Sequence, residues 1–258
     1  MRKFLAISIL IVCFLGISGV AKAESWSDDF NDGIFNSALW GGYLHPGESN
    51  LVESNRVLNF NALPSSLPLN NNFAVYGTNM VVDFTKNFKF GVDFNNSYSG
   101  QHSGGLNIGL ARVNGQGSIF DLNANVFSAD ATAITGGGQK FFRAEINDGH
   151  NSSWSSQGNR NVDTGSLFIE YLTAGDTLKF YALDLAHNSL GVGEYQGFTN
   201  TYGRDPMHVF IGGWAGNDAQ FSANLDNFQG TVTPEPISSA LFLLGGGALA
   251  FIGRKRKK

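Results

Sequence analysis

The sequence predicts an all-β protein: a two-sheet antiparallel jelly-roll sandwich, with an apolar signal helix at the N-terminus and a single apolar helix at the C-terminus. Three observations support this prediction. Short runs alternate apolar and polar residues, glycine-rich or asparagine-rich turns separate these runs, and no stretch between the two ends keeps a helical period for a dozen residues. A period of two gives each strand one apolar face, and two sheets bury such faces against each other.

The N-terminus carries the three parts of a secretory signal peptide. Two basic residues precede an apolar run and a small-x-small cleavage site: Arg2, Lys3, residues 4–20, Ala21 and Ala23. We therefore predict a signal peptide over residues 1–23 that signal peptidase removes after Ala23. An uncleaved signal anchor is the alternative, because the apolar run is slightly long. The one cysteine, Cys13, lies within this run, so the exported protein should contain no cysteine.

The C-terminus combines a proline-containing tripeptide, an uncharged run and a basic cluster. These parts are Pro234, Glu235 and Pro236, then residues 237–252, then Arg254, Lys255, Arg256, Lys257 and Lys258. As a helix, the uncharged run would span roughly 24 Å at about 1.5 Å per residue, slightly less than a hydrocarbon core of about 30 Å. The basic cluster would keep the end of the chain on the cytoplasmic side of a membrane. A single C-terminal membrane anchor is the simplest interpretation.

This tail resembles the PEP-CTERM sorting signal of Gram-negative bacterial proteins. The resemblance covers residues 234–258 and implies processing by exosortase near the tripeptide. It also implies an exported protein of the cell envelope, the cell surface or the extracellular matrix, whose C-terminal helix lies transiently or stably in the inner membrane. Cleavage of the tail and its retention as an anchor both stay open.

Residues 24–233 form the predicted β-sandwich domain, which is long enough for one sizeable core. Strands are predicted at residues 56–61, 80–84, 88–94, 106–113, 118–127, 140–146, 166–172, 177–183, 207–211 and 221–228. The whole chain has a net charge of −4, but only nine of the basic residues lie in this domain, together with twenty acidic ones, so the domain carries −11. Such a charge favours solubility and cation binding and excludes a dedicated nucleic-acid binder.

The domain also resembles secreted bacterial proteins of the concanavalin-like, or laminin-G-like, jelly-roll superfamily. The resemblance rests on its opening and closing segments, Asp29-Phe30-Asn31-Asp32-Gly33 followed by Trp40, and Leu225-Asp226-Asn227-Phe228. It implies that the terminal strands lie near one another.

No motif in the domain identifies an enzyme. Laminarinase-type glycoside hydrolases of the same fold carry Glu-x-Asp-x-x-Glu on one strand, which places the carboxylates on or near one face for acid/base and nucleophilic catalysis. At residues 145–148, Glu145 matches the first glutamate of that pattern, but Asn147 stands in place of the aspartate, and the second glutamate is missing. The histidines, at positions 45, 102, 150, 187 and 208, lack metal-ligand spacing. We therefore predict a non-catalytic domain, with a secreted glycan hydrolase or lyase as the alternative.

Glycan binding, to an extracellular polysaccharide, is the predicted role of this domain. Trp154 lies in a Ser/Asn-rich stretch that favours an exposed indole, and Tyr98 and His102 lie in a Ser/Gly-rich loop. Aromatic rings and amide groups suit the apolar faces and hydroxyl rims of sugars. The other tryptophans are predicted to anchor the core: Trp26, Trp40 and Trp214. An envelope-anchored structural domain without a ligand is the remaining interpretation.

Calcium is the candidate cofactor. Carboxylate and amide groups gather at the end of the first strand, where the last strand also arrives: Asp28, Asp29, Asn31, Asp32 and Asp226. Calcium takes six to eight oxygen ligands of these kinds. The alternative is turn and capping chemistry, for which Asp and Asn are equally suited.

Overall fold

The computed structural model describes residues 23–44, 49–62, 71–99, 104–112, 127–136, 139–147, 152–159, 162–215 and 220–233. Ala21 and the residues of the predicted sorting signal, 234–258, lie outside these ranges, whereas Ala23 is described and exposed. None of the helices in the described ranges is long and apolar enough to cross a membrane.

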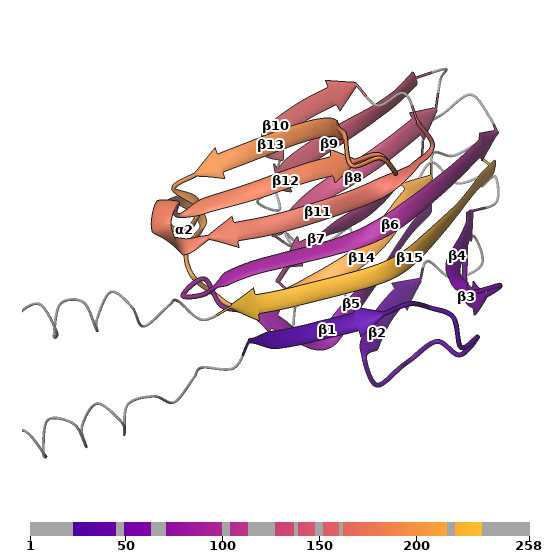
Figure 1. Ribbon diagram of the computed structural model, residues 1–258, viewed down its shortest axis with the longest axis horizontal. Helices are drawn as coiled ribbons and strands as arrows, with labels where there is room; N and C mark the ends of the chain where they lie inside the picture. The colour runs from indigo at the N-terminus through magenta and orange to yellow at the C-terminus, as the bar shows by residue number, and fades with distance from the viewer. Residues whose placement is uncertain are drawn as a thin grey trace, which may run out of the picture. The chain divides into compact units, whose positions relative to one another are not determined.

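The described chain folds into two sheets that lie face to face, as predicted (Figure 1). The eight-stranded sheet has the order β13 (Ser189–Gln196), β12 (Thr177–Leu183), β11 (Thr164–Leu172), β6 (Asn87–Ser99), β15 (Gln220–Thr233), β4 (Val57–Ala62) and β3 (Ser49–Ser54), with β1 (Glu24–Asp28) paired to β15. The seven-stranded sheet has the order β10 (Ser152–Asn159), β9 (Gln139–Asn147), β8 (Ser128–Gly136), β7 (Gly104–Ala111), β14 (Met207–Ala215), β5 (Asn71–Val82) and β2 (Trp40–Leu44).

Six of the ten predicted strands lie within observed ones. The prediction at 56–61 starts one residue before β4, and the prediction at 106–113 runs past Ala111, where β7 ends. Residues 80–84 run past the end of β5 into the following turn. Residues 118–126 fall outside the described ranges, and Phe127 precedes β8 instead of ending a strand. Strands such as β10 and β13 were not predicted, because serine and glycine hide their alternation.

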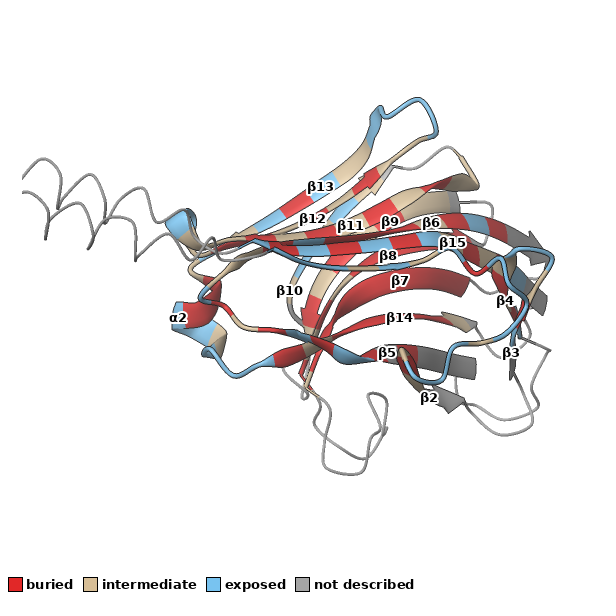
Figure 2. Ribbon diagram, turned by 60° about the horizontal axis from the view of Figure 1, so that its bottom comes forward, coloured by how far each residue is buried: buried red, intermediate tan, exposed pale blue. Residues whose placement is uncertain are grey.

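The core lies between the sheets, where buried strand segments face each other (Figure 2). It is rich in aromatic residues. Alternate residues of each strand face it, for example Phe88, Phe90, Val92 and Phe94 of β6. Edge strands β10 and β13 approach each other and close one side of the sandwich, with a hydrogen bond of 3.5 Å from Ser156 Oγ to the carbonyl of Val192.

The opening and closing segments of the domain meet in the core. Strand β1 pairs with β15, so the terminal strands are neighbours as the resemblance implied. The Trp40 ring lies edge-on to Phe228 at 4.9 Å and 6.2 Å from Phe30. Its indole Nε1 donates a hydrogen bond of 2.8 Å to Asp28 Oδ2. The Asp-rich opening segment is therefore tied to the last strand through one buried tryptophan.

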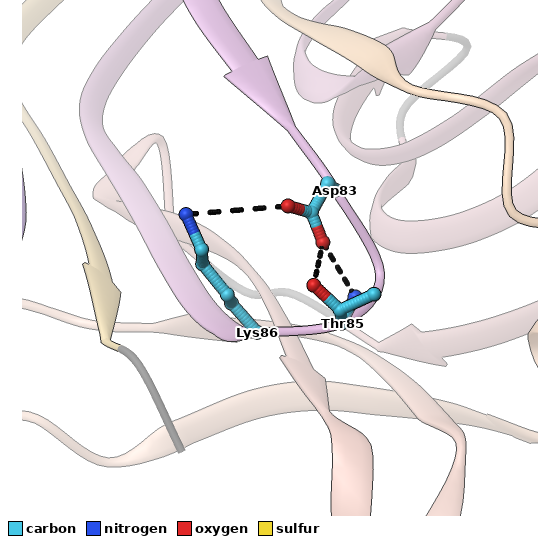
Figure 3. Close-up of polar contacts among 3 residues, drawn as sticks. All are labelled: Asp83, Thr85 and Lys86. Atoms are coloured by element: carbon cyan, nitrogen blue, oxygen red, sulfur yellow. Dashed lines mark hydrogen bonds and ion pairs between the residues drawn. The ribbon is translucent and has the colours of Figure 1, made fainter. Parts of the chain in front are cut away.

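Asp83 organises the connection between β5 and β6 (Figure 3). Its Oδ1 accepts hydrogen bonds from the backbone N–H of Thr85, at 2.7 Å, and from the Thr85 hydroxyl, while Lys86 Nζ lies 4.0 Å from Oδ2. Partial burial acts to raise the pKa of Asp83, but the Thr85 bonds and the Lys86 charge together hold it below the usual value. The Asp83 carboxylate therefore stabilises the turn between β5 and β6.

Asp176 has a similar structural role at the short helix α2 (Phe198–Tyr202). Its carboxylate accepts hydrogen bonds from the backbone N–H groups of Thr199, at 2.9 Å, and Asn200, at 3.2 Å, and from the Tyr171 hydroxyl at 2.9 Å. Burial acts to raise the pKa of Asp176, but these bonds hold it below the usual value. Burial and the neighbouring carboxylate raise the pKa of Tyr171 to about 12.

Candidate functional site

The outward face of the seven-stranded sheet, which points away from the core, carries an unusual set of buried polar residues. Core-facing residues such as Leu106 and Ile108 alternate on β7 with Gly105, Asn107 and Gly109. Strand β7 is nevertheless buried along its whole length, as its uniform colour in Figure 2 shows. The outward side chains of β7 are therefore covered as well.

Strand register aligns these outward side chains into rows across the sheet. One row contains Gln157, Arg143, Thr132, Asn107 and Gly212, each directly opposite the next. The adjacent row contains Ser155, Glu145, Asp130, Gly109 and Phe210. Both rows are exposed at β10, half-buried at β9 and at Asp130 of β8, and buried at Thr132 and on β7.

Charge in these rows is concentrated on β8 and β9. Arg143 Nη2 lies 2.8 Å from Glu145 Oε2 on the same strand. Asp130 stands opposite Glu145 and accepts hydrogen bonds from the Thr132 hydroxyl, at 2.5 Å, and from the Asn107 amide. Burial raises the pKa of Asp130 to about 6, and the charge of Glu145 adds to this, although the hydrogen bonds and the nearby Arg143 act in the opposite direction.

Two polar atoms of this face are buried without a hydrogen-bond partner in the described structure: Asn107 Oδ1 and Arg143 Nε. Asn107 is only 5% exposed. A buried donor or acceptor without a partner costs about 1–3 kcal/mol, so such groups in a folded protein need an explanation, and an ordered water or a ligand is the usual one.

Trp214 lies on the same face, in the row next to that of Asn107. It is opposite Gly105, and a Cβ atom placed on that glycine would lie 3.1 Å from Trp214 Nε1 and 2.9 Å from Thr132 Cγ2. The glycine therefore gives the indole room next to Thr132. The prediction that Trp214 anchors the core is wrong, because strand alternation turns it outward, where it is half-buried.

The described structure includes the side chain of only one of the predicted glycan-binding residues, Trp154. Trp154 is half-buried on β10 and packs toward the core, with its ring 5.8 Å from Phe180 and edge-on to Tyr195. Tyr98 belongs to β6, but its side chain lies outside the described part, as does all of His102. Glycan contact by these three residues stays a prediction.

The predicted calcium ligands mostly bond within their own turns. Asp28 Oδ1 accepts from Phe30 N at 3.0 Å, and Asp32 Oδ1 accepts from Ile34 N at 2.9 Å. The Asn31 amide donates to Asp29, and Asp226 Oδ1 accepts from Asn227 N at 2.7 Å.

Other acids lie near these residues. Burial raises the pKa of Asp226, with smaller contributions from Asp93 and Asp29. Glu53, which sequence reasoning did not single out, is buried and accepts a hydrogen bond of 2.9 Å from Gly33 N. Among the residues that the structure describes, no three His, Cys, Asp or Glu side chains are grouped to hold a metal ion. Calcium binding stays a prediction.

Comparison with protein families identifies the C-terminal sorting signal. Residues 232–257 match the PEP-CTERM protein-sorting motif, in agreement with the sequence analysis. This motif indicates export and surface sorting in bacteria, with processing by exosortase. No curated protein matches the chain.

Solved structures with the same fold include lectins and a carbohydrate-binding module. Lectin II from Ulex europaeus is 10% identical, with a TM-score of 0.59 over 81% of this chain and 98% of its own. The winged bean acidic lectin, solved with methyl-α-D-galactose, is 12% identical, with a TM-score of 0.59 over 82% and 99%. The CBM2 module of the evolved Dit protein of Lactobacillus casei BL23 phage J-1 is 16% identical, with a TM-score of 0.58 over 81% and 96%. These likenesses establish a concanavalin-like jelly-roll fold.

Proposed function

We propose that this protein is an exported bacterial surface protein whose jelly-roll domain binds carbohydrate on the outward face of the seven-stranded sheet. One observation carries the proposal: buried polar atoms without partners lie on the same face of the sheet as a half-buried tryptophan. A sugar offers what these groups lack, because its hydroxyls both donate and accept hydrogen bonds and its ring has an apolar face.

The chemistry of the face supports a polyhydroxylated ligand. Asn107 Oδ1 is a free acceptor, and Arg143 Nε is a free donor. The Trp214 indole supplies a flat apolar surface, together with an N–H group that makes no hydrogen bond to another described residue. Binding sites commonly combine such an aromatic surface with a few polar groups that fix orientation.

The fold comparisons support the same class of ligand. Structures that share this fold include lectins and a carbohydrate-binding module, one of them solved with a galactoside. The sorting motif supports a location where extracellular polysaccharide is within reach. We further propose a Gram-negative host, with the C-terminal helix in the inner membrane until exosortase acts.

The binding proposal is tested by calorimetric titration against an array-selected oligosaccharide. Trp214→Ala should weaken binding about tenfold, because the variant lacks the flat apolar surface that the indole offers to a sugar ring. Trp154→Ala tests the residue that the sequence favoured, and Tyr181→Ala on the other sheet is the matched control. Unchanged affinity in Trp214→Ala would remove this face from the proposal.

The sorting proposal is tested by mass spectrometry of the C-terminus of the protein recovered from cells. We expect a product that ends near Pro234. A basic tail on all of the protein would contradict processing and support a retained anchor.

Glycan hydrolysis is the second candidate, because Asp130 and Glu145 stand opposite each other on adjacent strands and face the same side. Paired carboxylates are the groups that glycosidases use. Release of new reducing ends from a bound oligosaccharide, lost in Glu145→Gln, would support hydrolysis. An intact oligosaccharide after prolonged incubation would leave binding alone.

A further inference from the structure

The charges on the outward face of the seven-stranded sheet are not balanced. Glu145 is paired with Arg143 at 2.8 Å. Asp130, directly opposite Glu145, makes no ion pair with a residue that the structure describes, and its hydrogen bonds come from two neutral groups, Thr132 and Asn107. Two carboxylates and one guanidinium leave this part of the face with an uncompensated negative charge.

The neighbouring amide adds a second acceptor. Because the Asn107 amide nitrogen donates to Asp130, its Oδ1 is left as an acceptor, and that atom is buried without a partner. Asp130 is half-buried as a residue, whereas Asn107 is only 5% exposed, so we place the approach of a ligand on the Asp130 side. A carboxylate without a cation and an amide oxygen without a donor thus lie side by side.

We infer that Asp130 and Asn107 form a subsite for a primary ammonium group, and that the glycan bound here carries free amino groups, as in deacetylated glucosamine units. This inference rests on the carbohydrate-binding function proposed above. An ammonium supplies three N–H donors and one positive charge. It pairs with the Asp130 carboxylate and has donors left for the amide oxygen of Asn107.

Other sugar substituents fit this subsite less well. An acetamide group has no charge, offers a single N–H donor and brings a carbonyl acceptor toward two acceptors. A uronate would meet Asp130 and Glu145, of which only the latter is neutralised by Arg143. A hydroxyl can donate a single hydrogen bond and leaves the charge of Asp130 uncompensated. The subsite therefore selects by the substituent and not by the ring.

The test uses three β-1,4-linked hexasaccharides that differ at carbon 2: hexamers of glucosamine, of N-acetylglucosamine and of glucose. Hexalysine is the fourth probe, because the domain carries a net charge of −11 and could attract any polycation. Affinities of the purified protein are measured by calorimetry at neutral pH and moderate salt. We expect the glucosamine hexamer to bind at least tenfold more tightly than the other three, as a charge-assisted hydrogen bond allows.

Two matched variants locate the effect. Asp130→Asn keeps the size of the side chain and an acceptor for Thr132, and it should abolish the preference for the glucosamine hexamer. Glu194→Gln also removes one negative charge, but on the eight-stranded sheet, where Glu194 Oε2 lies 3.4 Å from Lys179 Nζ. This control should retain the preference. Thermal melting of both variants checks that they are folded, and the comparison of sugars needs only the natural protein.

The outcomes separate this inference from the proposed function. Equal binding of the three hexasaccharides, or tight binding only of a neutral glycan, would leave carbohydrate binding in place and overturn the ammonium subsite. Hexalysine could bind as tightly as the glucosamine hexamer, or Glu194→Gln could lose the preference for that hexamer as fully as Asp130→Asn. Either result would indicate general attraction between charges and would overturn the ammonium subsite. Failure of every hexasaccharide and of a broad glycan array would overturn both proposals.

Discussion

The outward faces of the two sheets differ in how completely their polar groups are paired. On the eight-stranded sheet, Lys179 pairs with Glu194 at 3.4 Å, and Lys89 Nζ lies 4.9 Å from the centre of the Phe168 ring. Asp93 accepts hydrogen bonds from Ser166, at 2.5 Å, and from Asn227, at 3.0 Å. On the seven-stranded sheet, Asn107 and Arg143 bury polar atoms without partners in the described structure.

This difference is the reason we propose the outward face of the seven-stranded sheet as the binding face; the buried unpaired Asn96 Oδ1 of the eight-stranded sheet belongs to a side chain that faces the interior, where its amide nitrogen donates to the Ala133 carbonyl. Both faces carry charged and aromatic residues, so composition alone does not distinguish them. Pairing does, because a group whose bonds are complete within the protein gains little from a ligand, whereas an unpaired buried group gains a missing bond. The following predictions test this contrast, from the largest expected effect to the smallest.

Packing on the two faces is tested by adding one methyl group to each. In Gly109→Ala, the new Cβ would lie 2.6 Å from the Ala129 carbonyl oxygen and 2.6 Å from the buried Phe210 ring. Backbone cannot move away, so we expect a loss of about 3 kcal/mol in the free energy of unfolding. In Gly91→Ala, the contact is the half-buried Phe168 ring, which can turn toward solvent, so about 1 kcal/mol should be lost. Urea denaturation measures both, and equal losses would contradict the contrast.

Asp176 is the fully bonded counterpart of Asp130. Asp176→Ala removes the acceptor of Thr199, Asn200 and Tyr171, so the free energy of unfolding should fall by about 2–3 kcal/mol at neutral pH. Because the folded-state pKa of Asp176 lies below the usual value, its contribution is complete above about pH 4 and is lost as the pH falls through that folded-state value.

Chemical denaturation of Asp176→Ala and the natural protein over a series of pH values follows this dependence. The gap between the two proteins should therefore close in acid. The pKa of Tyr171, now about 12, should move back toward its ordinary value in the variant. A gap that is independent of pH would contradict the assigned role.

Asp130→Asn should raise the free energy of unfolding, whereas Asp176→Ala lowers it. A folded-state pKa of about 6 means that ionised Asp130 destabilises the fold above that pH, and protonation relieves this as the pH falls toward about 4. The variant should therefore gain about 1–2 kcal/mol at about pH 8 and nothing at about pH 4. A residue that costs stability while binding ligand is typical of a functional site. A loss of stability at about pH 8 would show that Asp130 is a structural residue.

Asp226→Asn should have the smallest effect. The pKa of Asp226 is raised by burial and by the Asp93 and Asp29 charges, so removing its own charge should add about 0.5 kcal/mol at neutral pH. Thermal melting with and without millimolar calcium measures this and tests the calcium prediction. If calcium binds here, only the natural protein should melt at a higher temperature when calcium is added.

Sequence periodicity was sufficient for the fold and insufficient for the site. Alternation in residues 88–94 predicted a strand with one apolar face, because every second position is phenylalanine or valine. The same rule failed for β10, where Trp154 is surrounded by serine and its inward direction is not visible in the sequence. Strands of this kind are defined only by their partners in the sheet.

The candidate site joins residues that are far apart in the chain. Asn107, Asp130 and Arg143 belong to three strands, and only strand register brings them together on one face. The Gly-Gly-Trp sequence at 212–214 was the available signal, since glycines next to a tryptophan on a strand leave room for a large ring. The side of the sheet to which the Trp214 side chain points nevertheless depends on which residues of β14 face the core.

The central claim is that ligand binds over Trp214, and the four tryptophans allow a direct test. In a nitrogen–proton correlation spectrum, each indole N–H gives its own signal. When an oligosaccharide that binds the protein is titrated in, the Trp214 signal should shift. The signal of Trp40, which is buried and hydrogen-bonded to Asp28, should stay in place. A shift confined to Trp154, or none in any tryptophan while calorimetry records binding, would contradict the account.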